Sequence, residues 1–169
     1  DRLRYLTDKY NGSITCLYAA PGLLQKLIGQ ADLVIGAVLV PGASAPKLIT
    51  RQMVSGMKPG SVIVDVAIDQ GGCCEGSRPT THESPTFIVN DVVHYCVANM
   101  PGAVPETSTL ALNNATLPYI SELAKRGVRQ SFLYDKGFRN GLNVSNGHIT
   151  NTAVAAKFGY DIAQWEDVL

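Results

Sequence analysis

The chain has 169 residues, and its 14 basic and 14 acidic side chains give a formal net charge of zero. A nucleic-acid-binding protein usually carries an excess of basic residues, so this balance argues against a nucleic-acid partner. The longest apolar runs, such as residues 33–40, are too short to span a bilayer. The four cysteines lack zinc-site spacing, and a core of this size needs no disulfide, so we expect reduced thiols and a cytoplasmic location.

Residues 1–72 alternate between patterns of helix and strand. Apolar residues recur at helical spacing in three stretches, and alternating or β-branched residues form three others. We expect helices at residues 1–10, 23–28 and 48–54, and strands at residues 13–18, 33–38 and 62–65. Such a series implies an α/β fold with a doubly wound, mostly parallel sheet. The apolar runs of the second and third strands predict burial on both faces.

The remainder of the chain has fewer strand patterns. We expect strands at residues 86–89 and 92–97, a long helix at 105–126 and a short helix at 152–158. Residues 73–85 and 137–150 are rich in turn-forming and polar residues and predict irregular structure. Pro118 should kink or split the long helix because it lacks a backbone N–H. Gly127 should then end that helix.

The strand at residues 62–65 is the one that points to a functional site. Asp65 stands near its end, and Asp69 follows just beyond it, before Gly71 and Gly72. In open α/β sheets, ligands bind outside the carboxyl ends of the strands, and glycines there permit close approach of the backbone. Asp69 is therefore our candidate for catalysis, although an aspartate in such a turn commonly serves only as a cap.

Other chemically active residues have simpler explanations. We expect His94, inside a predicted strand, to be packed in the core, and His82, in a polar loop, to be solvated. Cys73 and Cys74 suggest a nucleophile, but no base accompanies them, which favours buried thiols. The dinucleotide fingerprint G-x-G-x-x-G is absent, because residues 36–42 have a different spacing. From motifs alone, a nucleotide and an unrelated ligand both remain open.

Six segments carry a resemblance that covers nearly the whole chain. They are residues 31–43 (ADLVIGAVLVPGA), 45–50 (APKLIT), 57–73 (MKPGSVIVDVAIDQGGC), 77–82 (SRPTTH), 94–101 (HYCVANMP) and 107–119 (TSTLALNNATLPY). In these segments the sequence resembles alanine dehydrogenase, within the alanine dehydrogenase and transhydrogenase nucleotide-binding family. The match runs from residue 1 to about residue 158 and corresponds to the C-terminal half of such an enzyme.

This resemblance implies a Rossmann-like fold and an NAD-dependent oxidoreductase that interconverts L-alanine with pyruvate and ammonia. It divides the chain into residues 1–104, the remainder of the NAD-binding domain, and residues 105–169, a connecting helix with the C-terminal part of the catalytic domain. The family's Gly-rich turn and ribose-binding acid would lie upstream, so we expect the chain alone to be inactive. The resemblance also implies a cytoplasmic homohexamer of L-alanine catabolism, with no nucleic-acid or membrane partner.

Site roles follow from the same resemblance, position by position. Asp69 matches the catalytic carboxylate of the family. The expected contacts with NAD are Arg2, Val38, Leu39, Val66, Ala67, Ile68, Asp69, Arg78, Val97, Ala98, Asn99 and Met100. Some relatives bind Mg²⁺ through a glutamate and a histidine four residues apart. Here Glu122 matches the glutamate but Arg126 takes the place of the histidine, so we expect no metal site.

Two alternative functions share part of this resemblance. The nucleotide-binding subunit of proton-translocating transhydrogenase has the same fold and the APKLIT segment, but carries an amide-type residue at the position of Asp69 and lacks the RPTTH segment. Both differences favour the dehydrogenase. An inactive binding fragment is the non-enzyme alternative, because half of the active site would lie outside the chain.

Overall fold

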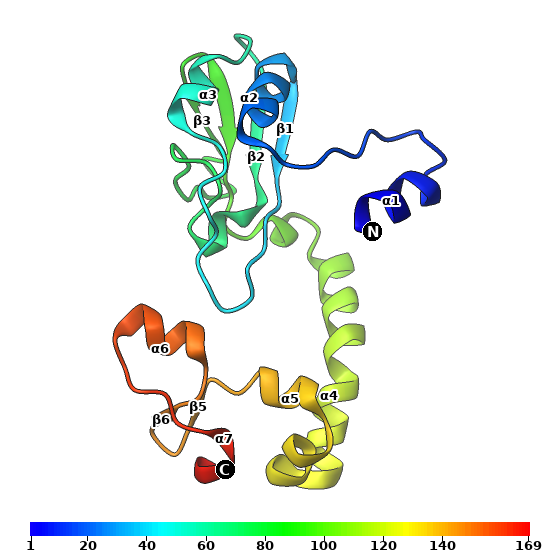
Figure 1. Ribbon diagram of the computed structural model, residues 1–169, viewed down its shortest axis with the longest axis vertical. Coiled ribbons are helices and arrows are strands. Elements are labelled where there is room, and N and C mark those ends of the chain that lie inside the picture. The colour runs from blue at the N-terminus through cyan, green and yellow to red at the C-terminus, as the bar shows by residue number, and fades with distance from the viewer.

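The computed structural model describes residues 1–169, with every side chain except that of Pro21. Its elements in chain order are α1 (Arg2–Lys9), α2 (Pro21–Gln30), β1 (Leu33–Gly36), α3 (Arg51–Ser55), β2 (Val62–Asp65), the 3₁₀ helix η1 (Val66–Gln70), β3 (Thr86–Val89), β4 (Val92–Tyr95), the 3₁₀ helix η2 (Met100–Ala103), α4 (Pro105–Tyr134), α5 (Lys136–Asn140), β5 (Val144–Ser145), β6 (His148–Ile149), α6 (Thr152–Phe158) and α7 (Trp165–Val168). Figure 1 shows α4 connecting the main sheet to the C-terminal elements.

The main sheet has four strands in the order β1–β2–β4–β3. β1 pairs with β2, and β2 with β4, in parallel, whereas β3 and β4 form an antiparallel hairpin. Asn90 and Asp91 link this hairpin at φ angles of 51° and 59°, the left-handed conformation that suits a two-residue hairpin turn. The expected mostly parallel α/β sheet is therefore confirmed.

The core lies on one face of this sheet, where α2 and α3 cover the strands. Ile28 from α2, Val54 from α3, Ile63 from β2 and Val92 from β4 belong to one buried cluster. Side chains of β1 point alternately to the two faces of the sheet, and Leu33 and Ile35 point to the uncovered face, where they are 54% and 61% exposed. The expectation that β1 is buried on both faces is wrong, because both helices pack on the same side of the sheet.

Several predicted boundaries differ from the structure. Residues 13–18 form no strand, and Ile14 and Tyr18 are exposed there. An extended segment needs a neighbouring strand for its hydrogen bonds, and β2 is the only partner of β1 in the sheet. β1 ends at Gly36 rather than residue 38, and β4 at Tyr95 rather than residue 97.

The helix expected from residue 48 begins later, as α3 at Arg51. Ile49 instead bridges to Cys74, and Thr50 caps the helix by accepting a hydrogen bond from the backbone N–H of Met53 at 3.2 Å. A threonine at this position satisfies one of the free donors of a helix start. Apolar spacing alone does not reveal such a cap.

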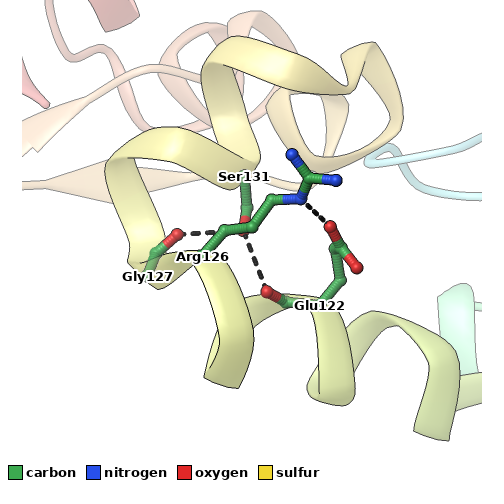
Figure 2. Close-up of polar contacts among 4 residues, drawn as sticks. All are labelled: Glu122, Arg126, Gly127 and Ser131. Carbon is green, nitrogen blue, oxygen red and sulfur yellow. Dashed lines mark hydrogen bonds and ion pairs between the residues drawn. The ribbon is translucent and has the colours of Figure 1, made fainter.

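Helix α4 breaks at Gly127, which has φ 75° and ψ 167°, and then continues to Tyr134. Pro118 lies inside the helix without non-helical angles, so the split expected there is wrong. Figure 2 shows how the break is held, with the buried hydroxyl of Ser131 donating to the carbonyl oxygens of Gly127 at 2.9 Å and Glu122 at 3.5 Å. The chain beyond Gly127 thus remains tied to the preceding turn.

The C-terminal part confirms the helix α6, but residues 137–150, where irregular structure was expected, contain a short hairpin and most of a short helix, and a further short helix lies near the end of the chain. β5 and β6 form a two-stranded hairpin, and α5 and α7 are short helices. Asn151 caps α6, because its Oδ1 accepts hydrogen bonds from the backbone N–H groups of Ala153 and Val154. Among the described residues, no helix is long and apolar enough to cross a membrane.

Candidate active site

The carboxyl ends of β1, β2 and β4 lie at one edge of the sheet, because these three strands run parallel. Three of the expected contact segments begin there. Val38 and Leu39 follow β1, residues 66–69 lie in η1 directly after β2, and residues 97–100 follow β4. The topology therefore brings together at one edge most of the residues that the sequence singles out.

Asp65 is fully buried at the end of β2 and surrounded by hydrogen-bond donors. The backbone N–H of Cys73 donates to its Oδ1 and Oδ2 at 3.2 and 3.0 Å, and that of Cys74 to Oδ2 at 3.1 Å. The Ser77 hydroxyl donates to Oδ2 at 2.5 Å, and the Cys73 thiol to Oδ1 at 3.4 Å. A buried carboxylate needs such donors, and here they hold the loop after β2.

Two glycines make room for this arrangement. A Cβ at Gly36 would lie 2.3 Å from Cys73 Sγ, and one at Gly72 would lie 2.8 Å from Asp65 Oδ2. Gly72 also has φ +76°, a conformation that L residues rarely adopt. Of the two glycines that follow the predicted strand, Gly72 therefore serves the packing around Asp65, whereas nothing lies within 4 Å of a Cβ at Gly71.

The cysteines of this loop are buried thiols, as expected. Cys73 and Cys74 are 1% and 0% exposed. Burial, assisted by the negative charge of Asp65, raises the pKa of the Cys73 thiol to about 12. Because the thiolate is the nucleophile, a thiol that stays protonated at neutral pH is unsuited to nucleophilic catalysis.

Asp69 has a different environment from Asp65, only one turn of η1 further on. It is exposed and lines a cavity of about 400 Å³ together with Gln70, the loop at residues 42–44 and Lys157 from α6. The side-chain Oε1 of Gln70 is buried without a hydrogen-bond partner among the described residues. The cavity thus offers a carboxylate, an amide and an ammonium group to a polar ligand.

Two lysines that the sequence did not single out shape this cavity. Lys47 Nζ donates to the carbonyl oxygens of Gly71 at 2.5 Å and Gly72 at 2.8 Å, and so fixes the backbone just after Asp69. Lys157 Nζ donates to the Ser44 hydroxyl at 3.4 Å, across the cavity wall. Lys47 lies within the APKLIT segment and could have been noticed, whereas nothing near Lys157 in the sequence indicates its partner.

The expected cofactor-contacting residues differ in what they expose. Leu39 is 67% and Val66 45% exposed, so both present apolar surface at the sheet edge. Ala67, Ile68 and Val97 are buried, and can offer a ligand little beyond their backbone. The others are distributed as follows: Val38 and Met100 are half-buried, and Ala98 and Asn99 are exposed.

The two expected arginines have other neighbours. The guanidinium of Arg2 lies 4.9 Å from the ring centroid of Tyr5 on α1, a helix that Figure 1 shows apart from the sheet. The guanidinium of Arg78 lies 4.5 Å from the ring centroid of Phe87 on β3. No hydrogen bond or ion pair within the described chain joins either arginine to Asp69.

The histidines agree with the sequence in burial but add contacts. His94 is fully buried, as expected. His82 is exposed, yet its Nε2 lies 2.7 Å from the backbone carbonyl oxygen of Asn99. Ser108, at the start of α4, donates to the carbonyl oxygen of Pro101 at 2.8 Å. These contacts fix the segment after β4, whose Asn99 lines a second cavity, of about 690 Å³, with η2 and α4.

Glu122 and Arg126 are paired with each other on α4. The Arg126 Nε donates to Glu122 Oε1, as Figure 2 shows. An arginine cannot ligate a cation, since it has no lone pair to offer. Within the part of the chain that the structure describes, no group of three or more histidine, cysteine, aspartate or glutamate side chains could hold a metal ion.

Comparison with known proteins agrees with this architecture. The family model for the alanine dehydrogenase/PNT C-terminal domain matches residues 1–152. The chain belongs to this family. An alanine dehydrogenase of Halomonas elongata is 56% identical over 163 residues, which are 96% of this chain and 44% of that protein. One of Staphylococcus haemolyticus is 50% identical over 169 residues, covering 99% of this chain and 45% of the relative.

Solved structures support the same assignment. A structure of L-alanine dehydrogenase aligns with a TM-score of 0.79 and 47% identity over 94% of this chain and 44% of its own. The transhydrogenase from Sinorhizobium meliloti aligns with a TM-score of 0.56 and 31% identity over 62% of this chain and 30% of its own. The 169-residue chain spans slightly less than half the length of the curated relatives it matches.

Proposed function

We propose that the chain forms part of an NAD-dependent alanine dehydrogenase, which interconverts L-alanine with pyruvate and ammonia. Asp69 carries this proposal: it is an exposed carboxylate in a cavity at the carboxyl edge of the sheet. Asp65 cannot take the same role, because it is buried and its oxygens accept hydrogen bonds from Cys73, Cys74 and Ser77.

The residues at the sheet edge fit a dinucleotide. Exposed Leu39 and Val66 offer apolar surface on which planar rings could pack. Gly71 and Gly72, both at positive φ, allow the backbone after η1 to turn sharply without side chains in the way. In this proposal Leu39 contacts the adenosine side, and Val66 with Asn99 and Met100 lines the nicotinamide side. Bound NAD would supply the hydride acceptor, and the protein would orient it.

In the proposed reaction Asp69 acts as a general base or as an electrostatic stabiliser. Its carboxylate oxygen accepts a proton from the water that adds at the substrate carbon, or stabilises the positive charge on the substrate nitrogen. Lys47 holds the backbone that follows Asp69 and so limits its movement. A carboxylate held in place in this way needs little reorganisation during the reaction.

The same proposal extends to the organisation of the protein. We assign residues 1–104 to the NAD-binding domain, and residues 105–169 to a connecting helix and the C-terminal part of the catalytic domain. The break at Gly127 within α4 falls in this second part. We also propose that the complete protein is a homo-oligomer, a hexamer by resemblance, located in the cytoplasm.

The test is a chimera in which the part of the Halomonas elongata relative upstream of the matched region is joined to residues 1–169. We expect alanine-dependent formation of NADH, measured by absorbance, and no activity from residues 1–169 alone. A folded chimera that forms no NADH from alanine but exchanges hydride between two nicotinamide nucleotides would favour the transhydrogenase function. A folded chimera with neither activity would favour a binding fragment.

A further inference from the structure

The loop between η1 and β3 lies along the segment that follows β4. The backbone N–H of Thr80 in this loop donates to the carbonyl oxygen of Cys96 at 2.9 Å. The backbone N–H of Ala98 donates to the carbonyl oxygen of Thr80 at 3.4 Å, and Thr80 forms a parallel bridge with Val97. This pairing ties the loop to the start of residues 97–100, the segment that we expect to contact NAD.

His82 makes a further contact between the loop and this segment. Its Nε2 lies 2.7 Å from the backbone carbonyl oxygen of Asn99. Because a carbonyl oxygen only accepts hydrogen bonds, Nε2 must carry a hydrogen and act as the donor. The backbone N–H of Gly102 donates to the same oxygen at 3.0 Å. Two donors from separate parts of the chain thus determine the direction of this carbonyl group.

Gly102 packs closely against this contact. A Cβ at Gly102 would lie 2.9 Å from Nδ2 of Asn99 and 3.3 Å from Nε2 of His82. A larger residue would therefore press against both the amide and the ring. Ser108, at the start of α4, donates to the carbonyl oxygen of Pro101 at 2.8 Å. The segment is thus held by the loop at Asn99 and by α4 at Pro101.

The orientation of Asn99 depends on this carbonyl group. The backbone at Asn99 has φ −121° and ψ 63°, which lies outside the helical and strand regions. A donor to the carbonyl oxygen limits rotation about ψ, and so sets how the side chains of Asn99 and Met100 are oriented relative to each other. The Asn99 side chain is exposed and lines the cavity of about 690 Å³. It makes no hydrogen bond with any described residue, so its amide is available to a ligand.

We propose that His82 is a positioning residue, which holds Asn99 and Met100 in the orientation that meets the nicotinamide end of NAD. This inference rests on the proposed function, in which both residues line the nicotinamide side. His82 does not line the cavity itself, so it acts through the backbone of Asn99. Its loss should weaken binding of the nicotinamide end alone, because the proposed adenosine contact, Leu39, follows β1.

The test compares two ligands of the chimera described above, NADH and ADP-ribose, which lacks the nicotinamide ring. NADH binding is followed by the fluorescence of its nicotinamide, and ADP-ribose binding by calorimetry. His82→Gln keeps an N–H donor near the position of Nε2, whereas the shorter amide of His82→Asn does not reach that position. We expect His82→Asn to raise the Kd for NADH about fivefold, and His82→Gln to remain within about twofold of the unsubstituted chimera.

Two controls separate positioning from a structural role. The Kd for ADP-ribose should be the same in both His82 variants and in the unsubstituted chimera, because the adenosine end is bound elsewhere. His148→Asn is the matched substitution at an exposed histidine on β6 and should bind both ligands normally. A loss of structure around His82 would instead weaken NADH and ADP-ribose together.

Three results would overturn the proposal. The first is a His82→Asn variant that binds NADH like the unsubstituted chimera, which would leave His82 as a solvated side chain. The second is an equal loss of affinity for NADH and ADP-ribose. The third is a His82→Gln variant that binds NADH as weakly as His82→Asn, because the hydrogen-bond donor would then not be the group that matters.

Assays with alanine separate this inference from the proposed function. A folded chimera that binds NADH but forms none from alanine would contradict the dehydrogenase reaction. The binding comparison of the His82 variants would still decide whether His82 positions the nicotinamide end. A folded chimera that binds no NADH would overturn both.

Discussion

Asp65 and Asp69 have very different surroundings, although they are only four residues apart. Asp65 ends β2, and Asp69 lies in η1, which follows directly. Asp65 is buried, and backbone N–H groups, a hydroxyl and a thiol donate to it. Asp69 is exposed in a cavity that Lys157 reaches from α6. The comparison teaches that position after a strand does not separate a structural carboxylate from one that is free to meet a ligand, whereas burial and the number of donors do.

Asp69→Asn should have the largest effect, and on rate alone. In the chimera we expect kcat to fall by about two to four orders of magnitude, because the amide cannot act as a base. The melting temperature should change little, since Asp69 is exposed. Steady-state kinetics and thermal melts measure the two quantities. A variant that turns over alanine at nearly the normal rate would remove Asp69 from the mechanism.

Asp65→Ala should give the opposite result, with stability as the main loss. Removal of the carboxylate leaves the buried donors of Cys73, Cys74 and Ser77 unpaired, and we expect the free energy of unfolding to fall by about 3 kcal/mol. Asp32→Ala is the matched control, because Asp32 pairs with Lys58 on the surface and such pairs contribute little. Equal losses in urea denaturation for both variants would contradict the structural role of Asp65.

Gly72→Ala and Gly71→Ala separate backbone strain from the space around Asp65. Both glycines have positive φ, but only at Gly72 would a Cβ come within 2.8 Å of Asp65 Oδ2, whereas at Gly71 nothing lies within 4 Å. We expect a loss of about 1 kcal/mol for Gly71→Ala and about 2 to 3 kcal/mol for Gly72→Ala. Chemical denaturation measures both. Similar values for the two variants would mean that the packing around Asp65 tolerates a methyl group.

His94 should give the smallest effect, as a pH dependence. Burial lowers its pKa in the folded protein, so below about pH 6.5 the unfolded chain binds a proton that the folded chain does not. The free energy of unfolding should therefore decrease as the pH falls from 7 to 5, by at most about 1.4 kcal/mol per pH unit. This component should vanish in His94→Phe and persist in His148→Phe, whose histidine is exposed. A pH dependence that His94→Phe leaves unchanged would assign the effect to another group.

The sequence predicted the parts of the fold that depend on local pattern. The apolar run of β2, the hairpin of β3 and β4 and the helices α1, α2 and α6 are all present. The strand expected at residues 13–18 is absent, because strand formation depends on a neighbour that local pattern does not contain. The helix end expected at Gly127 is present as a break in α4, where Gly127 has positive φ, whereas the split expected at Pro118 is absent because Pro118 keeps helical angles.

Only the part of the candidate site that lies at the carboxyl ends of the strands could be predicted from the sequence. The rule that ligands bind at the carboxyl ends of parallel strands identified the segment that contains Asp69. Lys157 approaches the same cavity from α6, and His82 reaches the carbonyl oxygen of Asn99 from a loop 17 residues away in the sequence. Contacts of this kind depend on how distant segments pack, and no periodicity in one sequence encodes them.

The outer edge of β1 has a practical consequence for handling the protein. β1 pairs on one side only, with β2, and turns Leu33 and Ile35 outward. A free strand edge with apolar side chains is a template for another chain, and therefore a route to aggregation when residues 1–169 are produced alone. The same edge suits fragment complementation. Co-expression with a separate upstream piece of a relative should then raise the soluble yield of both pieces, without a peptide bond between them.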